Sequence, residues 1–129
     1  MNKTVMVAGL LLAATTSWAG WKNTASVWVS GNMAGGMLGT ARNSADTRQH
    51  IGCSITTYTS TSSNTYTYAT CDAADAGTAY GSCITYNPDL IATIRSLDPD
   101  GRLFFLWDSA GTCQYINVQA DSALEPRKP

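Results

Sequence analysis

Alternation of hydrophobic and polar residues predicts that most of this chain forms short β-strands. The clearest case is residues 65–71, where threonine alternates with tyrosine, because β-branched and aromatic residues on a period of two are typical of a strand. Residues 50–59 have the same character, and the turn-forming residues 60–64 between them predict a hairpin. Comparable patterns predict further strands or short extended pieces at residues 25–30, 38–42, 78–86, 103–107 and 112–118.

Only residues 87–97 show the spacing of a helix. Asn87 can cap its first turn, and Pro88 fits the first helical position. Residues 103–107 are apolar on both faces, so we expect a buried strand at the centre of the sheet, packed against the helix. The pattern predicts a β-rich α+β domain: an antiparallel sheet or sandwich of about six or seven short strands with one helix. The apolar side chains of the helix recur on one face: Leu90, Ile91, Ile94 and Leu97.

The first 19 residues have the organisation of a secretory signal peptide. Lys3 and the amino terminus supply the positive charge, and an apolar run follows. Ser17 and Ala19 are small residues at the positions that a signal peptidase recognises. The apolar run is shorter than the about 20 residues that span a bilayer. We therefore expect residues 1–19 to be removed on export.

The rest of the chain has the size of one domain, which we place at residues 20–120, followed by a flexible tail at residues 121–129. The net charge is −1 and no basic stripe is present, which argues against nucleic acid as a partner. No further segment suggests membrane contact after cleavage of the leader. The expected location is secreted or periplasmic.

The chain has four cysteines, Cys53, Cys71, Cys83 and Cys113. They contain no Cys-x-x-Cys pair, so their spacing disfavours structural zinc, and in an exported chain they predict two disulfides. Cys53–Cys71 and Cys71–Cys83 each lie symmetrically about a predicted turn, and counting alone leaves three connectivities. We prefer Cys71–Cys83 with Cys53–Cys113, because the second bond would close a long loop and tie the last hairpin to the early strands.

Four short motifs occur in a distinctive order. They are Gly-Thr-Ala-Arg-Asn-Ser-Ala-Asp at 39–46, Ile-Gly-Cys at 51–53, Phe-Leu-Trp-Asp at 105–108 and Gly-Thr-Cys at 111–113. In this order the chain resembles small exported proteobacterial proteins of unassigned function, over most of its length after the leader. The resemblance implies export, and it carries no catalytic or binding residues.

A hydrolytic centre can be considered around His50, the only histidine. Ser44, Asp46 and Arg48 are close to it in sequence. In a strand or turn, however, these side chains diverge, whereas a hydroxyl nucleophile needs a base within hydrogen-bond reach. A secreted ribonuclease is disfavoured too, since the only glutamate is Glu125 in the tail. Enzymatic activity therefore stays open as a hypothesis, but the sequence favours a non-catalytic protein.

The candidate binding residues lie on the tyrosine-bearing hairpin and in the polar segment before it. Tyr66 and Tyr68 share one face of their strand, and Thr65 and Thr67 the other, so we expect one set to cover the core and the other to meet solvent. A tyrosine-lined sheet face can stack sugar rings or meet a protein. We add the polar loop that contains the other three candidates: Arg42, Arg48 and His50.

Three functions remain open from the sequence. The first is an exported non-catalytic domain, either binding or envelope-associated, whose ligand is a protein, a glycan or a component of the cell envelope. The second is a small secreted hydrolase that uses His50, and the third is a self-associating structural subunit. Aspartates in predicted turns, such as Asp98 and Asp100, are explained by turn chemistry and lack the spacing of a calcium loop, so we expect neither metal nor cofactor.

Overall fold

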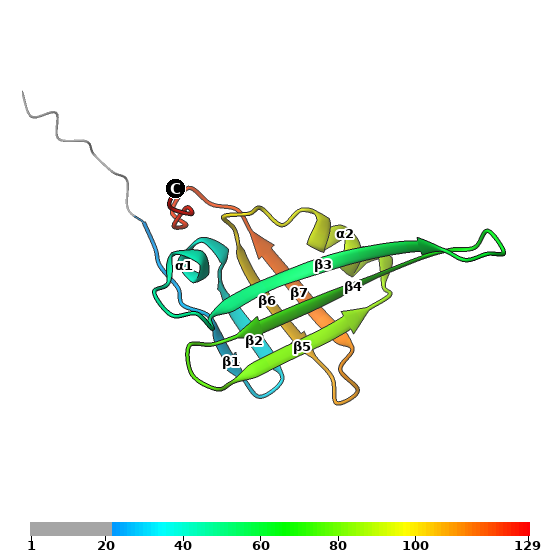
Figure 1. Cartoon of the computed structure of the whole chain (residues 1–129), viewed down its shortest axis with the longest axis horizontal. Helices are drawn as coiled ribbons and strands as arrows, with labels where there is room; N and C mark the ends of the chain where they lie inside the picture. Colours follow the sequence, from blue (N-terminus) through cyan, green and yellow to red (C-terminus); the bar gives the residue numbers. More distant parts are fainter. Residues whose placement is uncertain (1–21) are drawn as a thin grey trace, which may run out of the picture.

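The computed structural model describes residues 22–129, which form two antiparallel sheets (Figure 1). The predicted signal peptide lies outside these residues. One sheet has the order β1–β2–β6–β7, and the other has the order β3–β4–β5 and crosses in front of it in Figure 1. The predicted β-rich α+β class is confirmed. The strands are β1 (Trp28–Ser30), β2 (Met33–Met37), β3 (His50–Thr59), β4 (Thr65–Ala74), β5 (Tyr80–Thr85), β6 (Arg102–Trp107) and β7 (Cys113–Gln119).

Two helices are present in the described part, where the pattern predicted one. The expected helix is α2 (Pro88–Arg95), and the side chain of Asn87 caps it by accepting from the N–H of Asp89 at 2.8 Å. The other is α1 (Leu38–Asn43), in a segment that was expected to be extended. Tertiary contacts explain the difference, because the Leu38 N–H donates to the Gly101 carbonyl at 3.0 Å and the first residues of α1 are buried.

The glycine-rich segment before α1 is not among the predicted strands, but it forms β2. Two of its glycines are required because neighbouring residues of the chain approach the backbone closely at these positions. A Cβ at Gly35 would lie 2.9 Å from Cζ2 of Trp28, and one at Gly36 would lie 2.9 Å from the Cα of Val27. The tryptophan therefore packs directly on the backbone of β2, and a strand rich in glycine is stabilised by its neighbours rather than by its own propensity.

The core lies between the two sheets. Leu103 and Phe105 of β6 are fully buried, and Ile91 and Ile94 of α2 pack into the same cluster. As predicted, β6 is an interior strand, with β2 and β7 on its two sides. The helix packs mainly against β7 and the β3–β4 hairpin, so it closes the side of the sandwich between the two sheets.

The β3–β4 hairpin extends beyond the rest of the molecule (Figure 1). All ten residues of β3 pair with β4 without a register shift, whereas β5 reaches along β4 only to Ala69. We call residues 56–68 the projecting hairpin. Contrary to our expectation, neither of its faces covers the core, because Tyr66 on one face and Thr65 on the other are both exposed.

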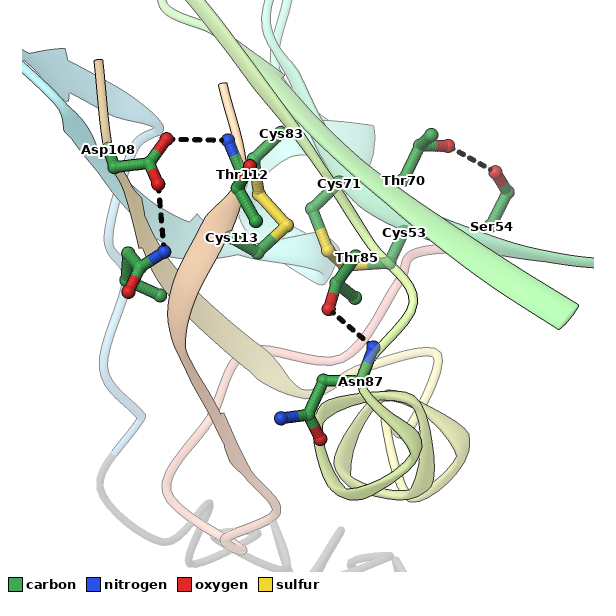
Figure 2. The surroundings of a disulfide bond; sticks show 11 residues. Cys53, Ser54, Thr70, Cys71, Cys83, Thr85, Asn87, Asp108, Thr112 and Cys113 are labelled. Atoms are coloured by element: carbon green, nitrogen blue, oxygen red, sulfur yellow. Dashed lines mark hydrogen bonds between the residues drawn. A yellow bond between two sulfur atoms is a disulfide. The ribbon is translucent and has the colours of Figure 1, made fainter. Parts of the chain in front are cut away.

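The two disulfides are Cys53–Cys71 and Cys83–Cys113, so the preferred pairing was wrong (Figure 2). Cys71 lies on the central strand in register with both Cys53 and Cys83, and it bonds to Cys53. Cys83 is on β5, at the opposite edge of the sheet from β3. There the Ile84 N–H donates to the Gly111 carbonyl at 3.0 Å, which brings the start of β7 within reach of β5. The second bond therefore joins the two sheets.

The C-terminal segment, expected to be a flexible tail, is attached to the body beside α1 (Figure 1). Leu124 is buried, and the Glu125 N–H donates to the Asn23 carbonyl at 3.1 Å. The hydroxyl of Thr40 donates to Oε2 of Glu125 at 2.9 Å. The Lys128 N–H donates to Oδ1 of Asn43 at 2.8 Å, so the contacts with α1 continue almost to the end.

Candidate functional site

Four tyrosines contact one another on the outer face of the three-stranded sheet, at the end that carries the projecting hairpin. Tyr58 of β3 stacks on Tyr66 of β4 with ring centroids 5.3 Å apart. Tyr68 of β4 lies 6.5 Å from Tyr58 and 5.9 Å from Tyr86, which follows β5. Tyr58, Tyr66 and Tyr86 are 50 %, 45 % and 66 % exposed, so the row faces solvent. We call the outer side of β3, β4 and β5 the tyrosine face.

The middle of the tyrosine face carries hydroxyl groups. Ser54 and Thr70 share a hydrogen bond of 2.8 Å across β3 and β4, one residue away from the Cys53–Cys71 bond on the inner side (Figure 2). A shallow cavity of about 340 Å³ lies next to this pair, with Thr70, Ser82 and Tyr80 in its lining. The face therefore combines aromatic rings with donors and acceptors of hydrogen bonds.

His50 and Asp72 form a hydrogen-bonded pair at the other end of the tyrosine face. Nε2 of His50 lies 2.8 Å from Oδ2 of Asp72, its diagonal neighbour on β4, and Nδ1 lies 3.0 Å from the carbonyl oxygen of Arg48. Both partners are acceptors, so both hydrogen bonds form together only when the ring carries two protons. The aromatic ring of Tyr80 lies beside the pair, with centroids 6.4 Å apart.

The hydrogen bonds that His50 makes within residues 22–129 involve no hydroxyl group. Both ring nitrogens of His50 are engaged, and no hydroxyl group forms a hydrogen bond with either of them in the part of the chain that the structure describes. Ser44, the hydroxyl considered together with His50, donates to Oδ2 of Asp46 instead.

The structure does not bring the two arginines of the prediction onto the tyrosine face. Arg42 is on α1, where its Nη1 donates to the Pro99 carbonyl at 2.5 Å and lies 3.8 Å from Oδ1 of Asp100. Arg48 precedes β3 and contributes its backbone carbonyl to His50. Of the five predicted binding residues, Tyr66, Tyr68 and His50 therefore share a face.

The loop that contains Arg48 is organised by Asp46. Its carboxylate accepts from the Ser44 hydroxyl and from the N–H groups of Gln49 and Arg48, and these bonds hold the pKa of Asp46 well below its usual value. Oε1 of Gln49 in turn accepts from the Val27 N–H at 2.6 Å. The loop therefore links the chain before β1 to the start of β3, which is a structural role.

The sixth tyrosine, Tyr115, lies on the other sheet. Its ring centroid is 5.8 Å from that of Phe104, which lies 5.9 Å from Trp28. These rings are tilted by 66° and 39°, values similar to the 69° and 43° between Tyr68 and its two neighbours on the tyrosine face. Tyr115 is 47 % exposed, close to the value for Tyr66, and it therefore offers a matched control for substitutions on the tyrosine face.

Asp72 is the member of the site that sequence reasoning missed. It lies just after the predicted strand 65–71, in a run, Asp-Ala-Ala-Asp-Ala-Gly, that has turn composition, but β4 continues to Ala74. If the pairing of the predicted hairpin is continued in the same register toward the next turn, Asp72 lies opposite Gly52, on the same face as His50.

Comparison with protein-family models, curated proteins and solved structures finds no significant match. Within residues 22–129, no three His, Cys, Asp or Glu side chains lie close enough together to hold a metal ion. The helices described in the structure are all too short or too polar to cross a membrane.

Proposed function

We propose that this protein is an exported binding domain that holds an uncharged glycan on its tyrosine face. The observation that carries the proposal is the solvent-facing row of Tyr58, Tyr66, Tyr68 and Tyr86, which continues into hydroxyl groups on the same sheet. Tyrosine has an apolar ring and a polar tip, and such rings cover the apolar faces of a ligand while their hydroxyls bond its polar groups.

The charge of the face favours a neutral ligand over a charged one. Asp72 is the one carboxylate among the outward residues of β3, β4 and β5, and its Oδ2 is already engaged by Nε2 of His50 at 2.8 Å, which disfavours an anionic ligand. The hydroxyls of Ser54, Thr70 and Ser82 both donate and accept hydrogen bonds, which matches the hydroxyl groups of a sugar. Protein interfaces share the enrichment in tyrosine, but they are enriched in methionine and arginine as well, and the outward residues of β3, β4 and β5 include neither.

Two further features support a location outside the cytoplasm. Two disulfides indicate an oxidising environment. The first 19 residues have the pattern of a cleaved leader, which supports secretion or a periplasmic location. Neutral glycans are available as ligands in both places, at the cell envelope or on another organism.

A glycan array probed with residues 20–129, followed by calorimetry with the retained sugars, tests the proposal. We expect Tyr66→Ala to weaken binding by about tenfold, equivalent to about 1.4 kcal/mol, whereas Tyr115→Ala on the other sheet should leave it unchanged. Circular dichroism of both variants checks that they are folded. An array without any retained glycan, or an equal loss in both variants, would refute the proposal. Retention of a protein instead would refute the ligand class.

A further inference from the structure

The outer edge of β3 has no partner in the described structure. β3 is the first strand in the sheet order β3–β4–β5, and all of its residues pair with β4 on one side. On the other side, no backbone group of residues 51–59 makes a hydrogen bond within the described part of the chain. The edge is therefore a row of N–H and C=O groups able to pair with another strand.

This edge lacks the features with which proteins usually prevent such pairing. Residues 51–59 contain no charged residue and no proline, and their register with β4 has no bulge. Charges, prolines and bulges are the common means of blocking an edge strand. The other edge strands differ from β3: β1 is only three residues long, β5 donates from the Ile84 N–H to the Gly111 carbonyl, and β7 pairs with β6 across a register shift.

The projecting hairpin carries the unpaired edge of β3 beyond the end of β5. Beyond Ala69, β4 has no β5 beside it, so residues 56–59 and 65–68 form a two-stranded ribbon that is largely exposed on both faces. A ribbon of two strands is at best marginally stable in water, whereas three or more strands, or packing against another element, stabilise it. A strand added along β3 would continue past the body and supply that support.

We propose that β3 pairs with β3 of a second copy of this chain, antiparallel about a two-fold axis. The result is a continuous six-stranded sheet with the order β5–β4–β3–β3–β4–β5. A second copy fits because residues 51–59 are uncharged, so two identical strands meet without repulsion, and threonine and tyrosine form favourable cross-strand pairs.

The symmetry has a consequence for the tyrosine face. A two-fold axis perpendicular to the sheet keeps the same face outward in both copies. The rows that contain Tyr58 and Tyr66 would then lie on one side of one sheet. The dimer does not require a glycan, so its test is independent of the proposed binding function.

Thr57 and Thr67 provide a matched pair of variants. They are cross-strand partners on the same face of the hairpin, with hydroxyl oxygens 2.9 Å apart, so replacing either one removes the same bond. Thr57 is on the edge strand, whereas Thr67 is on β4. A lysine at the edge disfavours strand addition and repels its symmetry mate. We therefore expect Thr57→Lys to be a monomer and Thr67→Lys to dimerise like the original protein.

Sedimentation equilibrium of residues 20–129 and the two variants, from low micromolar to near-millimolar concentration, measures this difference. Hydrogen exchange at both ends of this range should show concentration-dependent protection of alternate amides in residues 51–59. A monomer at all concentrations would overturn the proposal. Equal weakening by Thr57→Lys and Thr67→Lys, or association without protection in β3, would also overturn it, because the contact would then lie elsewhere.

Discussion

Loss of the Cys83–Cys113 bond should destabilise the protein by about 3–4 kcal/mol. The bond closes a loop with a separation of 30 residues, for which the loop-closure entropy in the unfolded chain corresponds to about 3.6 kcal/mol at 25 °C. Cys53–Cys71 spans 18 residues, and the same relation gives about 3.2 kcal/mol. Replacement of both cysteines of a pair by alanine removes only sulfur atoms, which adds a small packing loss.

Urea unfolding of the oxidised protein, of Cys83→Ala/Cys113→Ala and of Cys53→Ala/Cys71→Ala measures these losses. Reductant should lower the stability of each double variant further, by the contribution of its remaining bond. If Cys83→Ala/Cys113→Ala loses less than about 1 kcal/mol in the absence of reductant, the loop-closure reasoning fails for this protein. Domain stabilities are about 5–15 kcal/mol, so loss of one bond should leave a measurable transition.

Two further predictions concern the contacts around α1 and β3. A methyl group at Gly39 would overlap the Glu125 carbonyl oxygen. Gly39→Ala should therefore lower the free energy of unfolding by about 1–3 kcal/mol and expose the C-terminal segment to limited proteolysis. Gly52→Ala should do neither, because the space around Gly52 is open. Because the pKa of Asp46 is lowered in the fold, its contribution is full above the usual value near 3.9 and is lost as pH falls below it. The gap between the urea midpoints of the original protein and Asp46→Ala should therefore be constant above about pH 5 and narrow as the pH falls from about 4 toward 2; a gap that stays constant over this range would contradict this.

Local signals explain which elements the sequence could predict. The start of β3 at His50 and the cap of α2 at Asn87 follow from side chains adjacent to the element itself. By contrast, β2 and α1 depend on distant residues. Trp28 packs on Gly35, and the carbonyl of Gly101 accepts from Leu38, so neither element could be predicted from its own composition.

The candidate site shows the same division. Alternation alone placed Tyr66 and Tyr68 on one face, because the period of two is a property of the strand. The contact between His50 and Asp72 depends on how far the hairpin register continues toward the next turn. The disulfide pairing depended on which edge of the sheet meets the start of β7, and that is a relation between two sheets, which a single strand does not encode.

The four-stranded sheet is built from both ends of the described chain, with the whole three-stranded sheet inserted between β2 and β6. Ala34 pairs with Phe105, so this contact forms only after a long loop of the chain has closed. Hairpins, by contrast, form within microseconds. We therefore expect the β3–β4 hairpin and its Cys53–Cys71 bond to form early in oxidative refolding, and Cys83–Cys113 only when the two sheets meet. Alkylation of free thiols during refolding should trap a species that carries the first bond alone; the opposite order of bonds would show that the two ends of the chain meet first.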